Sequence, residues 1–127
     1  MWTTGSTRYG AYLTATSIPT FARAIREARD TGIQTAASNP CFELWLVLHV
    51  EPQTAHIHRR AIQRRCRDLG LVDGKALVEE AIPKLIEGYP EAKKKAQALD
   101  RMHEESGAPE GANPSSGVWR LIDRLRR

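Results

Sequence analysis

Residues 38–50 read SNPCFELWLVLHV, and this stretch decides most of what the sequence predicts about the fold. Its first three residues, Ser-Asn-Pro, are a strong turn and helix-start signal, because Ser and Asn cap helices and Pro is tolerated in the first turn. The residues that follow, 42–50, are apolar on nearly all sides, so they predict a short helix inside the core. The Glu-Pro pair at 51–52 ends it, since the residue before a proline disfavours the α region.

The segments before this stretch predict a helix and a short strand. Residues 20–30 carry an apolar stripe at i, i+3, i+4 and i+7, with Thr20 as a plausible N-cap, which indicates a helix. A small apolar run at 33–37 then predicts a strand. Residues 1–17 are rich in Thr, Ser, Gly and Tyr and are predicted to be coil, with room for a short strand at 11–14.

The segments after it are predicted to be mainly helical. They are a basic helix from 53 or 54 to 69, a helix over 73–87 weakened at Pro83, a turn at 88–90, a polar helix over 91–105, a loop over 106–116, and a last helix over 118–125 capped by Ser115 or Ser116. We therefore expect an α/β fold that is mostly helical, with at most two or three strands from a sheet whose other strands are missing. Such an unpaired edge predicts marginal stability.

Composition excludes several classes of protein. The chain has 127 residues, which favours one domain, and its 41% hydrophobic and 27% charged residues are ordinary for a globular protein. Two cysteines are too few for a disulfide framework, so a reducing cytoplasm is the expected location. No apolar run approaches the roughly 18–20 residues of a membrane span, and no secretory signal is visible.

Positive charge is concentrated in one segment. The net charge is +4, and residues 52–70 alone hold five arginines against one acid. Arg60, Arg64 and Arg67 share a helix face at i, i+4 and i+7. This face predicts phosphate contacts, or alternatively a solvated or partner-protein surface, and the aromatic interleaving that single-strand binding needs is missing.

The run SNPCFELWLVLHV resembles the signature of the RloB-like family, whose members are encoded beside a partner ATPase in bacterial restriction and abortive-infection (anti-phage) loci. The residues that carry the resemblance are Ser38, Asn39, Pro40, Phe42, Glu43 and Trp45. The flanking text over 22–45 and the closing segment NPSSGVWRLIDRL over 113–125 are similar to the family as well. We expect an RloB-like domain over 18–127, with an irregular segment of non-family sequence over 1–17.

The resemblance implies a Toprim-type α/β domain with Mg²⁺-dependent, nuclease-like chemistry. In that pattern an early Glu and a later Asp-x-Asp bind Mg²⁺, which prefers oxygen ligands. This chain has no Asp before Asp30 and no Glu before Glu27. We therefore expect Mg²⁺ only in a complete family member, and no catalysis from this chain alone.

A reading-frame change would explain the missing acids. Residues 9–16 read YGAYLTAT, and a permitted codon set read one base earlier encodes Val-Trp-Cys-Val-Phe-Asp-Arg-Asp. This is an apolar strand that ends in Asp-x-Asp. We hypothesise that residues 1–16 are out of frame and that the chain is a truncated remnant.

Two side chains of the motif are candidate catalytic groups. The resemblance implies that Glu43 is the surviving metal-binding acid, whereas its place in a first helical turn also favours a simple dipole interaction. His49 is a candidate general base, or a histidine favoured at a helix C-terminus.

The remaining polar and aromatic candidates have plainer interpretations. Ser38 and Asn39 stand at a strand-to-helix turn, where ligands bind in α/β sheets, but helix capping is the simpler role. Cys41 is a weak candidate nucleophile. We expect Cys66, Trp45 and Trp119 in the core. We expect no zinc site at His56 and His58, because no cysteine stands at a suitable spacing from them.

Three functions therefore stay open. The first is a defence nuclease subunit that acts with an ATPase, of which this chain is an inactive part. The second is a non-catalytic module that docks the ATPase through its amphipathic helices. The third is a basic helical nucleic-acid-binding protein.

Overall fold

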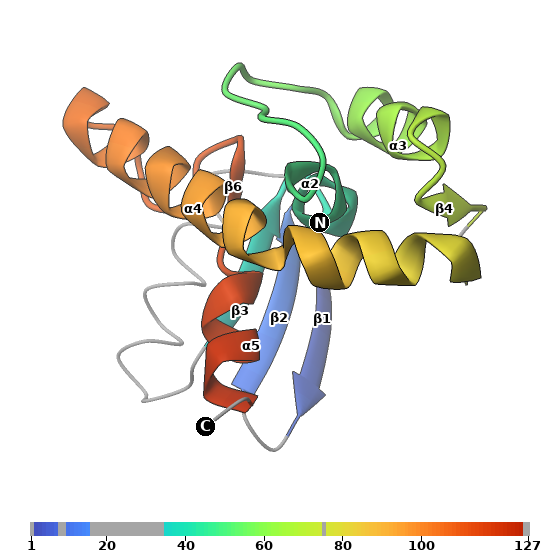
Figure 1. Cartoon of the computed structure of the whole chain (residues 1–127). Coiled ribbons are helices and arrows are strands. Elements are labelled where there is room, and N and C mark those ends of the chain that lie inside the picture. Colours follow the sequence, from blue (N-terminus) through green and yellow to red (C-terminus); the bar gives the residue numbers. More distant parts are fainter. Residues whose placement is uncertain (1, 8–9, 16–34, 75, 126–127) are drawn as a thin grey trace.

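The computed structural model describes residues 2–7, 10–15, 35–74 and 76–125 of the chain (Figure 1). Helices dominate this part, as expected. In chain order the elements are β1 (Trp2–Thr7), β2 (Gly10–Ala15), β3 (Thr35–Asn39), α2 (Phe42–Leu48), α3 (Arg59–Asp68), β4 (Val72–Asp73), β5 (Ala76–Leu77), the short 3₁₀ helix η1 (Glu79–Ala81), α4 (Ile82–Ser106), β6 (Ser115–Ser116) and α5 (Val118–Leu125).

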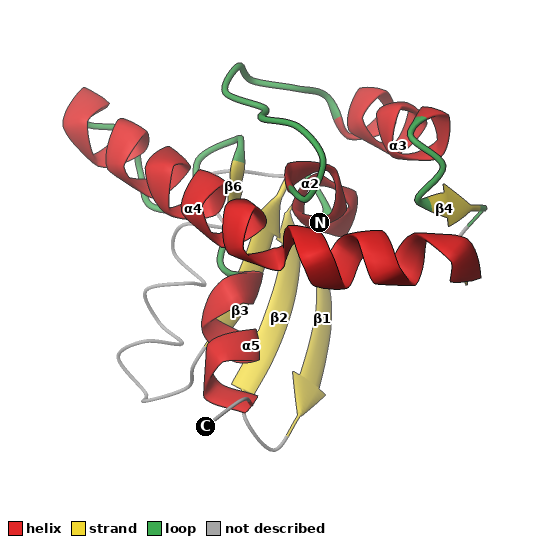
Figure 2. Cartoon of the chain, viewed as in Figure 1, coloured by secondary structure: helices red, strands yellow, loops and turns green. Residues whose placement is uncertain are grey.

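The main sheet has four strands in the order β1-β2-β3-β6. β1 and β2 form an antiparallel hairpin, and β2 runs parallel to β3 with Ala11 opposite Thr35 and Thr14 opposite Ser38. β6 closes the other side antiparallel to β3. In Figure 2 the helices α2, α4 and α5 lie in front of this sheet, and α2 and α5 both contact β3. The result is a mixed sheet covered by helices.

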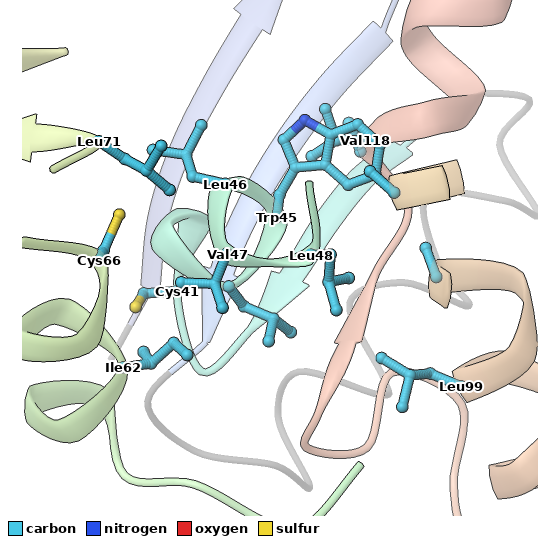
Figure 3. Close-up of a cluster of buried hydrophobic side chains, with 14 of the residues drawn as sticks. Cys41, Trp45, Leu46, Val47, Leu48, Ile62, Cys66, Leu71, Leu99 and Val118 are labelled. Carbon is cyan, nitrogen blue, oxygen red and sulfur yellow. The ribbon is translucent and has the colours of Figure 1, made fainter. Parts of the chain in front are cut away.

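The core is built around α2, which is buried on most of its surface. Leu44, Val47 and Leu48 are fully enclosed and Trp45 is 3% exposed. Their partners come from α3, α4 and the segments beyond (Figure 3): Ile62, Cys66, Leu71, Ala92, Ala96, Leu99 and Val118. Burying a leucine side chain fully stabilises a fold by about 1.5–3 kcal/mol, so this short helix is a major source of stability.

The N-terminal region departs from the prediction in one respect. The strand expected at 11–14 is confirmed as β2, but residues 2–7, predicted as coil, form β1. The alternation of apolar and polar residues there is too weak to predict a strand. Backbone pairing with β2 stabilises the strand instead. The described part of the sheet thus has four strands, where two or three were predicted. The predicted helix at 20–30 lies outside the described residues.

The basic helix begins later than predicted. α3 starts at Arg59, not at residue 53 or 54, because the preceding segment is held in an extended conformation. Asn113 accepts a hydrogen bond from the Ile57 amide at 3.1 Å and donates one to the Ile57 carbonyl at 2.7 Å. The His58 side chain then caps the helix by accepting from the Arg60 amide.

The helix predicted over 73–87 is wrong in its first part, where β4, β5 and η1 lie, and beyond it a single long helix replaces the predicted turn at 88–90. α4 runs from Ile82 to Ser106 without a break and crosses the molecule in Figure 1. Pro83 lies in its first turn, where a missing amide proton costs nothing. The predicted turn at 88–90 is wrong because α2 packs against that part of α4, and such packing overrides the local preference of Gly and Pro. None of the helices in the described ranges has the length and apolar character that crossing a membrane requires.

Candidate nucleic-acid interface around the motif

The carboxyl end of β3 is fixed by two side-chain hydrogen bonds. The Ser38 hydroxyl lies 3.0 Å from the Ser116 hydroxyl, and the Asn39 amide donates to the Gly111 carbonyl at 2.9 Å. Both residues are strand residues and both are buried, followed by Pro40. The predicted capping role is therefore wrong: Cys41 occupies the N-cap of α2, and the two polar side chains connect β3 to the C-terminal part of the chain.

Glu43 lies in the first turn of α2, as predicted, and one of its carboxylate oxygens is buried. Its Oε2 atom is enclosed and has no hydrogen-bond partner among the residues that the structure describes. The Glu43 carboxylate contributes to raising the pKa values of two buried thiols. Burial, reinforced by Glu43, raises the pKa of Cys41 to about 12 and that of Cys66 to about 11. Neither thiol is poised as a nucleophile, because only the thiolate reacts.

The arginine face of α3 is exposed and largely unpaired. Arg60, Arg64 and Arg67 are exposed, and none of them forms an ion pair within the described ranges. By contrast, Arg65 pairs with Glu51 through both carboxylate oxygens, with two distances of 3.1 Å, and this contact lowers the Glu51 pKa. The predicted face is therefore available for an external anion.

The basic helix and Glu43 act on the pKa values of the same two thiols. α2 and α3 pack together, and the charges of Arg59 and Arg67 lower the pKa values of the same two thiols that Glu43 raises. The structure thus brings the motif acid and the basic helix side by side, which the sequence alone did not show.

His49 lies at the opposite end of α2 from Glu43. Its Nδ1 atom is 2.8 Å from the Trp45 carbonyl, its ring meets the edge of the Trp45 ring at 4.7 Å, and burial lowers its pKa. The two predicted catalytic side chains are not brought together. Trp45 is a core residue as predicted, whereas Phe42, expected in the core, is 44% exposed.

The other histidines and Trp119 have structural surroundings. His58 caps α3 and His56 is exposed. Trp119 packs at the edge of the core, with the Arg120 guanidinium 4.7 Å from its ring centre.

The residues present do not by themselves fit a magnesium site. In the described part of the chain no three His, Cys, Asp or Glu side chains converge as a metal would require. The enclosed, unpartnered oxygen of Glu43 is suited to one ligand position, but Mg²⁺ is normally held by one or two carboxylates together with substrate phosphates. We derive no metal-dependent step for this chain.

Sequence reasoning missed a second polar region, a cavity beside α4 lined by Asp100, His103 and Arg120. Asp100 is paired with Arg120, yet burial raises its pKa. The spacing of Asp100, His103 and Glu104 at i, i+3 and i+4 was the available signal, because it places three polar groups on one helix face. The helix looked uniformly polar, so this face did not stand out.

The fold and the motif together define a small, mostly helical α/β domain with a strand–Ser-Asn-Pro–helix unit at its centre. The chain belongs to the RloB-like protein family, whose model matches residues 14–125. This confirms the resemblance drawn from residues 38–50. No curated protein and no solved structure gives a significant match.

Proposed function

We propose that this chain is the nucleic-acid-contacting part of an RloB-like anti-phage protein whose complete form is a Mg²⁺-dependent nuclease acting with an ATPase. One observation carries the proposal: the unpaired arginine face lies on α3, the helix that packs against α2, and α2 carries the motif acid Glu43. Guanidinium groups bind phosphate through paired hydrogen bonds, and such contacts release counterions from DNA. The chain binds the sugar-phosphate backbone and does not cleave it.

The sheet register supports the idea of a lost acidic motif. Parallel strands end at the same edge of a sheet, and ligands of α/β domains bind there. Thr14 of β2 pairs with Ser38 of β3, and Glu43 lies in the first turn of the helix that follows β3. In the shifted reading frame, position 14 is the first acid of Asp-x-Asp. A restored motif would therefore lie at the edge of the sheet where Glu43 follows β3.

The gene sequence tests the lost motif directly. We expect the DNA across codons 1–20, read one base earlier, to encode an apolar strand, Asp-x-Asp and an upstream Glu. The restored chain then acquires Mg²⁺-dependent cleavage that Glu43→Ala abolishes. Codons incompatible with Asp-x-Asp in that frame would eliminate the nuclease part of the proposal and leave backbone binding to be tested alone.

Backbone binding is tested by salt dependence. Fluorescence anisotropy of a labelled duplex is measured between about 50 and 200 mM salt for the chain and for the triple variant Arg60→Gln, Arg64→Gln, Arg67→Gln. Each lost phosphate contact reduces the slope of log K against log salt by about 0.9, so a reduction of about 2–3 is expected.

A control of equal charge separates contact from net charge. Lys84, Lys94 and Arg101 are exposed on α4, away from the arginine face, and their replacement by Gln removes the same three charges. This control keeps most of the slope. Equal losses in both triple variants would show that binding follows net charge and not the α3 face.

An exposed apolar patch favours a second candidate function, the docking of the ATPase. Leu77 in β5 and Ile82 and Ile86 in the first turns of α4 are 48%, 43% and 72% exposed. Apolar side chains exposed together often mark interaction sites. Capture of the ATPase encoded alongside that survives Glu43→Ala but is lost in Ile86→Glu supports this candidate, and capture insensitive to Ile86→Glu contradicts it.

A further inference from the structure

A polar cavity of about 430 Å³ lies between α4, α5 and the segment that leads into β6. Neither Glu43 nor the arginine face of α3 lines it. Its described walls carry the carboxylates of Asp100 and Glu104 and the guanidinium of Arg120. The volume is in the range of sites for small organic ligands.

The one guanidinium in these walls is already engaged. Arg120 donates to Oδ2 of Asp100 at 3.0 Å and lies over the Trp119 ring. Glu104 is exposed and takes part in no ion pair formed by the described residues. Among the described residues that line the cavity, Glu104 therefore offers a carboxylate that no cation neutralises.

Two buried side chains add hydrogen-bond acceptors. Ser115 is 4% exposed and lines the cavity, and its hydroxyl has no hydrogen-bond partner among the described residues. His103 is 9% exposed, with Nε2 2.7 Å from the Pro114 carbonyl oxygen. A carbonyl only accepts, so Nε2 carries the proton, and in the neutral ring Nδ1 is an acceptor.

We propose that this cavity binds a small organic cation through an ammonium or guanidinium group. Glu104 supplies the charge, while the Ser115 hydroxyl and the second oxygen of Asp100 accept hydrogen bonds; Arg120 contacts only Oδ2 of Asp100. The Ser115 hydroxyl lines the cavity and has no partner among the described residues, so a bound donor gives it one. A metal ion is disfavoured because no three metal-ligating side chains converge in the described part of the chain. A phosphate would face the carboxylates.

The test titrates the full chain with agmatine, which carries both cationic groups, and with inorganic phosphate as the anion. Binding is followed by NMR shifts of the His103 ring and the Ser115 and Gly117 amides. Saturable shifts with agmatine and none with phosphate are expected. Saturable phosphate binding at the same resonances, or no saturation with agmatine, would overturn the proposal.

Variants assign the binding to the cavity. Glu104→Gln weakens agmatine binding by about tenfold, since it removes a charge-assisted contact. Ser115→Ala removes only a neutral acceptor and weakens it by a smaller factor. Glu87→Gln alters an exposed carboxylate on the same helix outside the cavity and leaves the affinity within about twofold. Unchanged thermal melting confirms that each variant is folded. Equal weakening in Glu104→Gln and Glu87→Gln would reveal binding by overall charge and reject the site.

Discussion

Gly88 of α4 lies against the end of α2. Replacing it with alanine has two opposing effects on the stability of the fold. Gly88 is inside a helix, where alanine is better by about 1 kcal/mol, so propensity alone predicts stabilisation. An alanine Cβ, however, would lie 2.6 Å from the His49 carbonyl oxygen and 3.3 Å from the His49 Cβ. The first of these atoms is backbone at the end of α2 and cannot rotate away.

The steric effect is the larger one. An ordinary Cβ contact is at least 3.4 Å, so the two helices must separate by several tenths of an ångström along a packed interface. Overpacking of this kind costs about 1–3 kcal/mol, which exceeds the gain in propensity. We expect Gly88→Ala to lower the free energy of unfolding by about 1 kcal/mol and Tm by about 4 °C.

Urea denaturation and thermal melting followed by circular dichroism measure both quantities. Glu87→Ala is the matched control, because it changes the neighbouring exposed residue of the same helix and stays within about 0.5 kcal/mol of the parent. A Gly88→Ala chain more stable than the parent by about 1 kcal/mol would show that α2 and α4 are not packed as described.

Three further outcomes follow from burial and charge. Leu48→Ala removes a fully enclosed core side chain and should cost about 2–5 kcal/mol by urea denaturation; a cost under about 1 kcal/mol would contradict the packing of α2. Cys41, with a pKa of about 12, is about one part in 10,000 thiolate at pH 8, so a thiol reagent should label it only after unfolding, and rapid labelling of the native chain would refute its burial. Because the pKa of Asp100 is raised in the folded chain, the unfolded chain releases this proton at lower pH, and the contribution of Asp100 to stability falls as pH rises from about 3.9 towards the folded pKa. Asp100→Asn should therefore flatten that part of a curve of stability against pH. An unchanged slope would argue against burial of this carboxyl.

The sequence predicted well wherever a local pattern agreed with the tertiary structure. The motif helix, the last helix over 118–125 and the exposed arginine face were read correctly, because apolar periodicity and charge there match what is buried and what is exposed. The family resemblance came from the same thirteen residues, 38–50.

The failures lie where distant contacts override local preference. Ser38 and Asn39 look like caps, but partners more than seventy residues away hold them in a strand. Gly88 and Pro90 look like a turn, but α2 packs against the continuous helix. The cavity around Asp100 could not be predicted because its walls come from α4, α5 and a loop, and no single segment shows more than an ordinary polar helix.

The link between β3 and β6 sets the order in which this fold is completed during synthesis. Ser38 and Ser116 are 78 residues apart, so β3 gains β6 as a partner only after that many further residues have been added to the chain. Closing so long a loop is entropically costly, and contacts of this separation form late and slowly. During synthesis this edge of β3 therefore stays open until β6 has been made and can reach it.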